Sequence, residues 1–168
     1  MIRIGIVGHR FLGEQPTVDF VTEQCISILR QMKKRYRNVV ALSAIAEGAD
    51  MIFAEAASSL NIPFEIVRPF EEYIQDFETP VLKDRYLSLQ KMAVKEIRLP
   101  YDKRSEESYF YAMQWVVRNS DLLIAVWDGK EGTSGIGTAA TVKEAIRTNS
   151  NWIHLDVTSK FTTSHIIQ

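Results

Sequence analysis

Three short segments of this chain combine glycine with polar side chains that could bind a phosphorylated ligand. The first is the tripeptide Gly8, His9 and Arg10, which directly follows an apolar run. Gly8 lets a ligand approach the backbone closely, while His9 and Arg10 can donate hydrogen bonds to a phosphate. A plain glycine turn with two solvated side chains would have the same sequence, so the tripeptide alone leaves both interpretations open.

The second segment spans residues 43–50 and joins a predicted strand to a predicted helix through small residues. Free backbone N–H groups at such a helix start bind anions, and for that reason Ser43 and Gly48 belong to the candidate site. Glu47 stands inside the turn, where its carboxylate could accept a hydrogen bond from a ribose hydroxyl. Asp50 either caps the helix and complements its dipole or takes part in ligand binding.

The third segment is the richest in hydrogen-bond donors. Residues 132–138 hold three glycines and three hydroxyl side chains at the start of a predicted helix, where backbone and side chains can both donate to a phosphate. A flexible loop with Thr138 as the N-cap is the plain alternative. No Lys-Ser or Lys-Thr pair follows the last glycine, so the segment is not a Walker A loop. The candidate residues of this segment are Trp127, Asp128, Gly129, Thr133, Ser134, Gly135, Gly137 and Thr138.

The sequence also offers candidates for catalysis but none for metal binding. If the chain is an enzyme, we expect a carboxylate to activate water, and the candidates are Glu47, Asp128 and Glu144. No metal site is expected, because the three histidines are far apart in the sequence and have no cysteine nearby. Cys25 lies on the apolar stripe of a predicted helix and is expected in the core.

The elements that must position these segments alternate along the chain. Apolar, β-branched runs predict strands at residues 2–7, 39–44, 64–67, 122–127 and 152–157, with the last of these as the final strand. Apolar spacing predicts helices over residues 16–36, 49–60, 81–93, 105–118 and 138–147, helical spacing at 70–77 and a short strand at 97–101. Such alternation builds a parallel sheet with right-handed crossovers, and ligands bind at the carboxyl ends of its strands. The three segments are therefore expected to meet at one edge.

Aromatic residues cover more than one face of the helix predicted over residues 105–118. Some of them should belong to the core, and some should line the ligand pocket or a contact between subunits. The sequence leaves open whether two chains pair into a homodimer. The aromatic residues are Tyr109, Phe110, Tyr111 and Trp115.

Length and composition limit the class of protein further. At 168 residues the chain is expected to form one domain, with residues 158–168 as a polar tail that could pack loosely. A net charge of -1 gives no general attraction for DNA, so nucleic acid is not the expected partner. No signal peptide or membrane-spanning run is recognised, which makes the cytoplasm the default location.

The segments at residues 8–10, 44–50 and 121–129, with the glycine-threonine loop that follows, resemble the SLOG superfamily. This superfamily includes the LONELY GUY phosphoribohydrolases, the DNA-processing protein DprA and nucleotide-sensing modules of bacterial defence systems. The resemblance covers almost the whole chain and implies an α/β fold, a three-layer Rossmann-like open parallel sheet with helices on both faces. It also implies a ligand built on a nucleotide, such as a nucleoside monophosphate or an ADP-ribose derivative. Apart from a bound nucleotide, we expect no cofactor.

Departures from the LONELY GUY pattern leave the activity open. The loop of those enzymes contains a glycine-threonine step, matched by Gly137 and Thr138, and a glutamate whose position here is Thr141. Glu144 lies three residues later, about 300° further around the helix axis, so it is not an equivalent residue. Those enzymes also carry an Arg-Lys pair on the preceding helix, where this chain has aromatic residues around Tyr111.

The loop after the second predicted strand is similar to its DprA counterpart at Ser43, Ala46, Gly48 and Asp50. Binding of single-stranded DNA, as in DprA, would need a basic surface, which the net charge of -1 does not suggest. We therefore predict that the chain binds or senses a nucleotide or nucleotide derivative. The alternative is hydrolysis of the N-glycosidic bond of a nucleotide, and single-stranded DNA binding is a minor alternative.

Overall fold

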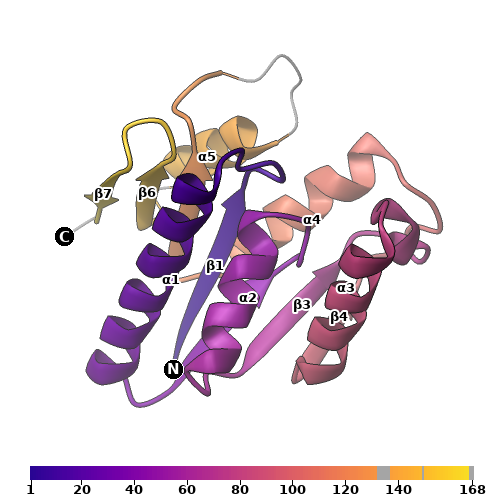
Figure 1. Cartoon of the computed structure of the whole chain (residues 1–168), viewed down its shortest axis with the longest axis horizontal. Helices are drawn as coiled ribbons and strands as arrows, with labels where there is room; N and C mark the ends of the chain where they lie inside the picture. Colours follow the sequence, from indigo (N-terminus) through magenta and orange to yellow (C-terminus); the bar gives the residue numbers. More distant parts are fainter. Residues whose placement is uncertain (132–136, 149, 167–168) are drawn as a thin grey trace.

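Seven strands form one sheet in the computed structural model, which describes residues 1–131, 137–148 and 150–166 (Figure 1). Their order across the sheet is β4-β3-β2-β1-β5-β6-β7; the first six are parallel, and β7 is antiparallel to β6. The strands are β1 (Ile2–Gly8), β2 (Val39–Ser43), β3 (Phe64–Arg68), β4 (Lys95–Arg98), β5 (Leu122–Trp127), β6 (Trp152–Asp156) and β7 (Phe161–His165).

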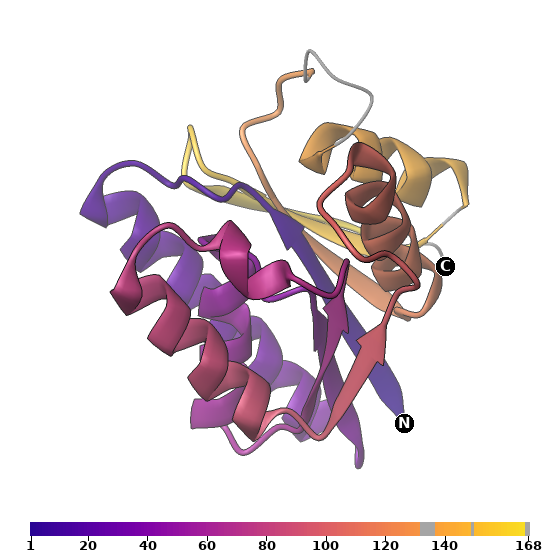
Figure 2. The same ribbon diagram turned by 90° about the vertical axis from the view of Figure 1, so that its right-hand side faces the viewer.

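Helices cover both faces of this sheet, as Figure 2 shows. One face carries α1, α2 and α3, the other carries α4 and α5, and each face has its own buried apolar cluster. Ile4 and Ile6 of β1 belong to the first cluster and Val7 to the second, because successive side chains of a strand point to opposite faces. The expected three-layer α/β architecture is thus confirmed. The helices are α1 (Gln15–Arg35), α2 (Ala49–Ser59), α3 (Pro80–Met92), α4 (Glu106–Arg118) and α5 (Thr138–Arg147).

The position of β1 in the middle of the sheet determines where a ligand can bind. The chain adds β2, β3 and β4 on one side of β1 and then returns to place β5 on its other side. The connections that follow β1 and β5 therefore lead to opposite halves of the molecule. In open parallel sheets such a switch point leaves a crevice at the carboxyl ends of the strands.

Two strand predictions are wrong in detail. The strand predicted at 152–157 is not the last, because Phe161–His165 pairs with β6 as β7. The side chains of β7 are mostly exposed, so no apolar pattern marks it; the turn before it is held by Asp156 Oδ1, which accepts N–H groups at 2.8 and 3.1 Å. The strand predicted at 97–101 lies at Lys95–Arg98, where a polar edge strand gives little apolar signal.

The helical spacing at residues 70–77 produces only one short 3-10 helix, η1 (Tyr73–Asp76). The aromatic side chains of residues 70–77 pack against other parts of the chain, and their spacing does not reflect a longer helix. Tyr73 and Phe77 pack against Tyr86 of α3, with ring centroids 5.6 and 4.7 Å apart. This packing fixes η1 beside the carboxyl ends of β1 and β2.

Of the helices in the described ranges, none has the length and apolar character needed to cross a membrane.

Candidate functional site

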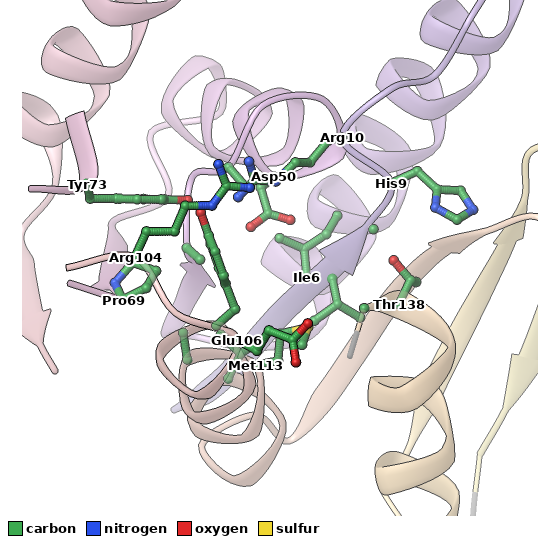
Figure 3. A pocket seen from close by; sticks show the side chains of 18 residues that line it. Ile6, His9, Arg10, Asp50, Pro69, Tyr73, Arg104, Glu106, Met113 and Thr138 are labelled. Atoms are coloured by element: carbon green, nitrogen blue, oxygen red, sulfur yellow. The ribbon is translucent and has the colours of Figure 1, made fainter. Parts of the chain in front are cut away.

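A cavity of about 400 Å³ opens at the carboxyl ends of β1 and β2 (Figure 3). Small and apolar side chains form much of its wall, and the charged groups come from three different parts of the chain. The size is within the range of small-molecule pockets, roughly 300–1,000 Å³. Its lining residues are Ile6, Val7, Gly8, His9, Arg10, Ala44, Ala46, Asp50, Pro69, Tyr73, Arg104, Glu106, Tyr109, Ala112, Met113, Val116, Gly137 and Thr138.

His9 and Arg10, adjacent in the sequence, extend to opposite ends of this cavity. His9 lies near Thr138, whereas Arg10 extends toward Tyr73 (Figure 3). The His9 Nε2 atom accepts a hydrogen bond from the backbone N–H of Asp128 at 3.2 Å, which ties it to the segment after β5. The tripeptide after β1 therefore serves two separate parts of the site, where the sequence suggested one.

Arg10 is held by a buried aspartate of η1. Its Nη1 donates to Asp76 Oδ2 at 2.6 Å, and the hydroxyl of Tyr109 donates to the same oxygen at 2.5 Å. Arg104 approaches from the segment before α4, with its Nη1 3.3 Å from Asp76 Oδ1. Burial and the hydrogen bond to Asp76 raise the pKa of Tyr109 to about 12, so its hydroxyl keeps its proton.

Asp50 is the buried carboxyl group of the cavity. It stands in the first turn of α2 with 6% of its surface exposed, and its side chain points into the cavity between Arg10 and Ile6 (Figure 3). Burial raises its pKa to about 7, although hydrogen bonds from the backbone of Ala46 and Ala44 and the charge of Arg10 all lower it. A carboxyl group in this state can accept or give up a proton near neutral pH.

Gly48 allows the segment that carries Asp50 to pack against the segment that carries Arg10. Its φ is 85°, and a Cβ atom there would lie 2.2 Å from the carbonyl oxygen of Arg10 and 2.6 Å from that of His9. Ala49 N–H also donates to the His9 carbonyl oxygen at 3.2 Å. Only glycine fits this approach of two backbones, which sets the position of Asp50 relative to Arg10.

The structure brings part of the predicted ligand-binding set together. Six of those residues line the cavity, namely Gly8, His9, Arg10, Asp50, Gly137 and Thr138. Six others do not line it, namely Ser43, Glu47, Gly48, Trp127, Asp128 and Gly129. Thr133, Ser134 and Gly135 lie outside the described residues.

Several residues outside the cavity lining have contacts that explain their placement. The buried hydroxyl of Ser43 accepts the N–H of Ile45 at 2.9 Å and donates to the backbone carbonyl of Asp50 at 3.2 Å, so it supports the turn. The indole N–H of Trp127 donates to the carbonyl of Lys130 at 2.9 Å, and its ring packs 5.5 Å from that of His154. These side chains position the segments that surround the cavity.

None of the three predicted catalytic carboxylates lines the cavity. Glu144 forms ion pairs with Arg147 at 2.8 Å and with Arg118 at 3.7 Å, and the hydrogen bond from Arg147 lowers its pKa. Burial alone would raise the pKa of Asp128, but the backbone N–H of Lys130 and the nearby His9 lower it. Glu47 is half-buried, and its charge raises the pKa of Arg85, although the hydrogen bond that Arg85 donates to Glu55 raises that pKa most.

Sequence reasoning missed Asp76 and Arg104 and placed Tyr109 only as one aromatic among four. The spacing of residues 70–77 indicated packing by the aromatic side chains and did not single out Asp76 among the three acidic residues of this range. That carboxylate is 1% exposed in its side chain, and an acidic residue inside an aromatic run is the signal that could have identified it. Within the described ranges, no group of three or more potential ligand side chains is placed to hold a metal ion.

Known structures share this architecture at low sequence identity. No protein-family model matches the sequence, and a search of curated proteins also finds no match. The X-ray structure of the structural-genomics target TM1055 matches with a TM-score of 0.59 at 16% identity, over 90% of this chain and 72% of that chain. DNA processing protein A from Helicobacter pylori, described for its single-stranded DNA binding mode, matches with a TM-score of 0.62 at 18% identity.

The match to DNA processing protein A covers 91% of this chain and 64% of that longer chain. The molybdenum cofactor carrier protein from Chlamydomonas reinhardtii matches with a TM-score of 0.57 at 15% identity, over 91% of this chain and 75% of that chain. Identities this low establish a shared fold and leave function to be argued from the site. The architecture expected from the sequence is confirmed by these neighbours: the chain shares their Rossmann-like α/β fold.

Proposed function

We propose that this chain binds a nucleotide or nucleotide derivative, such as a nucleoside monophosphate or an ADP-ribose-like ligand, in the cavity beside β1. The observation that carries the proposal is the cavity itself, which combines a helix start, a buried carboxyl group and an apolar wall. These features match the three parts of a nucleotide. A phosphate needs N–H donors, a ribose needs an acceptor for its hydroxyls, and a base needs an apolar surface.

The start of α5 supplies the phosphate end. Gly137 precedes the helix and Thr138 is its first residue, so the first backbone N–H groups of α5 have no partner within the helix. Such groups, together with the helix dipole, attract an anion. His9 lines the same end of the cavity and adds a side-chain donor.

Asp50 supplies the ribose site that the sequence analysis assigned to Glu47. Carboxylates commonly accept hydrogen bonds from ribose hydroxyls in folds of this kind, and Asp50 points into the cavity while Glu47 does not line it. Ala112, Met113 and Val116 of α4 form an apolar surface for the base. Of the four aromatic residues predicted to serve either the core or the pocket, Tyr109 lines the cavity.

Calorimetric titration with AMP, ADP-ribose, cyclic ADP-ribose and NAD tests the proposal. We expect at least one of them to bind with a dissociation constant well below the millimolar range. Asp50→Asn should weaken its binding about tenfold, because one charge-assisted hydrogen bond is lost. Asp128→Asn is the matched control at the same sheet edge and should bind like the wild type. Failure of all four ligands to bind better than millimolar would rule the proposal out.

Hydrolysis of the N-glycosidic bond is the second candidate, because the carboxyl group with a pKa of about 7 faces the ligand cavity. Water would attack C1′ of the ribose, the C1′–N bond would break, and the base would leave with the bonding electrons and take up a proton. Asp50 would accept the proton of the attacking water or supply the proton of the base. In this proposal Asp50 replaces Glu47, Asp128 and Glu144.

Chromatography after incubation with nucleotides decides between binding and hydrolysis. Release of free base by the wild type and not by Asp50→Asn supports hydrolysis. Binding without any release leaves the binding function alone.

Single-stranded DNA is the weaker candidate partner. The fold likeness to DNA processing protein A favours it, but the net charge of -1 offers little general attraction for a polyanion. A gel-shift experiment at two salt concentrations tests it. A shift that weakens with salt supports DNA binding, and the absence of any shift excludes it.

A further inference from the structure

The end of the cavity farthest from α5 contains a buried polar group without a partner. The hydroxyl of Tyr73 is fully enclosed, and no hydrogen-bond partner for it exists among the described residues. Tyr73 nevertheless lines the cavity, and Figure 3 shows its ring directed toward Arg10. Buried polar groups are nearly always paired, so an unpaired hydroxyl at a cavity wall indicates that the partner is a ligand.

At the same end, two arginines share one buried carboxylate. Arg10 and Arg104 both face the single carboxylate of Asp76, and their guanidinium carbons lie 5.0 and 5.8 Å from the ring centroid of Tyr109. One carboxylate cannot use the N–H groups of two guanidinium ions, each of which has five. Glu106 also lines the cavity and, like Arg104, is exposed to solvent. Two arginines that share one buried carboxylate form a site suited to an incoming phosphate.

The position of this group relative to the α5 end limits what the ligand can be. Figure 3 shows His9 and Thr138 on one side of the cavity, Tyr73 and Arg104 on the other, and Asp50 between them. With one phosphate at the start of α5 and the ribose at Asp50, a phosphate at Arg10 and Arg104 falls on the opposite side of the ribose. Two phosphates joined in a diphosphate would both extend from the same side.

We infer that Arg10, Arg104 and Tyr73 form a second phosphate subsite, and that the ligand is a nucleoside bisphosphate with its two phosphates on opposite sides of the ribose. The inference rests on the proposed nucleotide-binding function and specifies its ligand class. Arg10 and Arg104 bind the phosphate oxygens, and the hydroxyl of Tyr73 donates to the phosphate the hydrogen bond for which the described residues offer no acceptor.

Titration of the full chain with AMP, ADP and adenosine 3′,5′-bisphosphate tests the inference. The bisphosphate should bind at least about tenfold more tightly than AMP, because it gains charge-assisted hydrogen bonds to two arginines. ADP carries its extra phosphate on the same side as the first and should gain little over AMP. A gain of equal size for ADP would overturn the inference, since charge alone would then explain it.

Variants at the subsite separate ligand binding from a structural role. Arg104 is 70% exposed, so Arg104→Gln should fold normally, lower the affinity for the bisphosphate about tenfold and leave AMP binding unchanged. Lys103→Gln removes the same charge from an adjacent exposed residue outside the cavity lining and should change neither affinity. Tyr73→Phe should weaken bisphosphate binding without lowering the melting temperature, because the hydroxyl has no partner within the protein.

The outcomes distinguish the inference from the proposed function. If AMP binds and the 3′-phosphate adds no affinity, the inference of a second phosphate subsite is wrong, while the proposed nucleotide binding stands. If neither AMP nor the bisphosphate binds, both fail. Equal bisphosphate affinity in the wild type and Arg104→Gln also overturns the subsite.

Discussion

Two aspartates at the carboxyl edge of the same sheet differ sharply in their chemistry. Asp50 follows β2, is buried in the cavity wall and has a pKa raised to about 7. Asp128 follows β5, is partly exposed and has a pKa below its usual value, since the backbone N–H of Lys130 and the neighbouring His9 outweigh the effect of burial. Burial, rather than position after a strand, decides which carboxyl group can exchange a proton near neutral pH.

The backbones around the two aspartates explain the difference. The segment before α2 packs tightly against the segment after β1, with Gly48 in contact with the carbonyl of Arg10. The segment after β5 leaves open space around Gly129, where a Cβ atom would meet nothing within 4 Å. Asp50 is therefore enclosed by two packed segments, and Asp128 remains at the surface.

The largest expected effect is a difference in stability between alanine variants of Gly48 and Gly129. Gly48→Ala forces a Cβ atom to within 2.2 Å of a carbonyl oxygen at a φ of 85°, so we expect the free energy of unfolding to fall by roughly 3 kcal/mol. Gly129→Ala, at a φ of 77° in open space, should cost only the backbone strain of about 1 kcal/mol. Urea denaturation of both variants measures the two costs. Equal costs would contradict the tight packing of the segment before α2.

The next effect concerns the pH dependence of stability, which Asp50 should dominate near neutrality. Because its pKa is raised in the folded state, the folded chain binds its proton more tightly than the unfolded chain. Stability should therefore decrease as the pH rises from about 4 to about 7, by roughly 1 kcal/mol per pH unit. In Asp50→Asn the side chain stays polar but has no group that titrates. The free energy of unfolding of this variant should therefore not fall between about pH 4 and about pH 7.

Chemical denaturation of the wild type and Asp50→Asn at several pH values measures the difference. Parallel pH profiles for the two proteins would show that the carboxyl group of Asp50 is not held in a protonated, buried state. The buried pair of Asp76 and Arg10 is present in both proteins and so cancels in the comparison.

Regular elements with a strong apolar pattern were predictable from the sequence. The limits of β5 and α5 agree with the prediction, since a continuous apolar run marks the first and an amphipathic stripe the second. β7 was not predictable, because it depends on main-chain pairing with β6 and its side chains are mostly exposed.

The site was predictable only in part, because its composition depends on contacts between distant parts of the chain. Gly8, His9 and Arg10 follow a clear strand, and their presence in the cavity follows from the sheet. Asp76 reaches Arg10 from 66 residues away, through the packing of aromatic side chains around η1. No local pattern near Arg10 contains that information, so the second arginine and its shared carboxylate appear only in three dimensions.

The smallest expected effect is the contribution of Asp128 to the pH dependence of stability. Its sign is opposite to that of the contribution of Asp50. The lowered pKa of Asp128 means that the folded state favours the charged form, so its contribution is present above about pH 4 and is lost as the pH falls through the folded-state pKa. Because the side chain is partly exposed, Asp128→Asn should lower the free energy of unfolding at pH 7 by less than about 1 kcal/mol. Denaturation at pH 3 and pH 7 should show the variant and the wild type converging at the lower pH. A cost that instead grows toward low pH would mean that Asp128 is protonated in the folded state, and the two aspartates would no longer differ in the way their surroundings require.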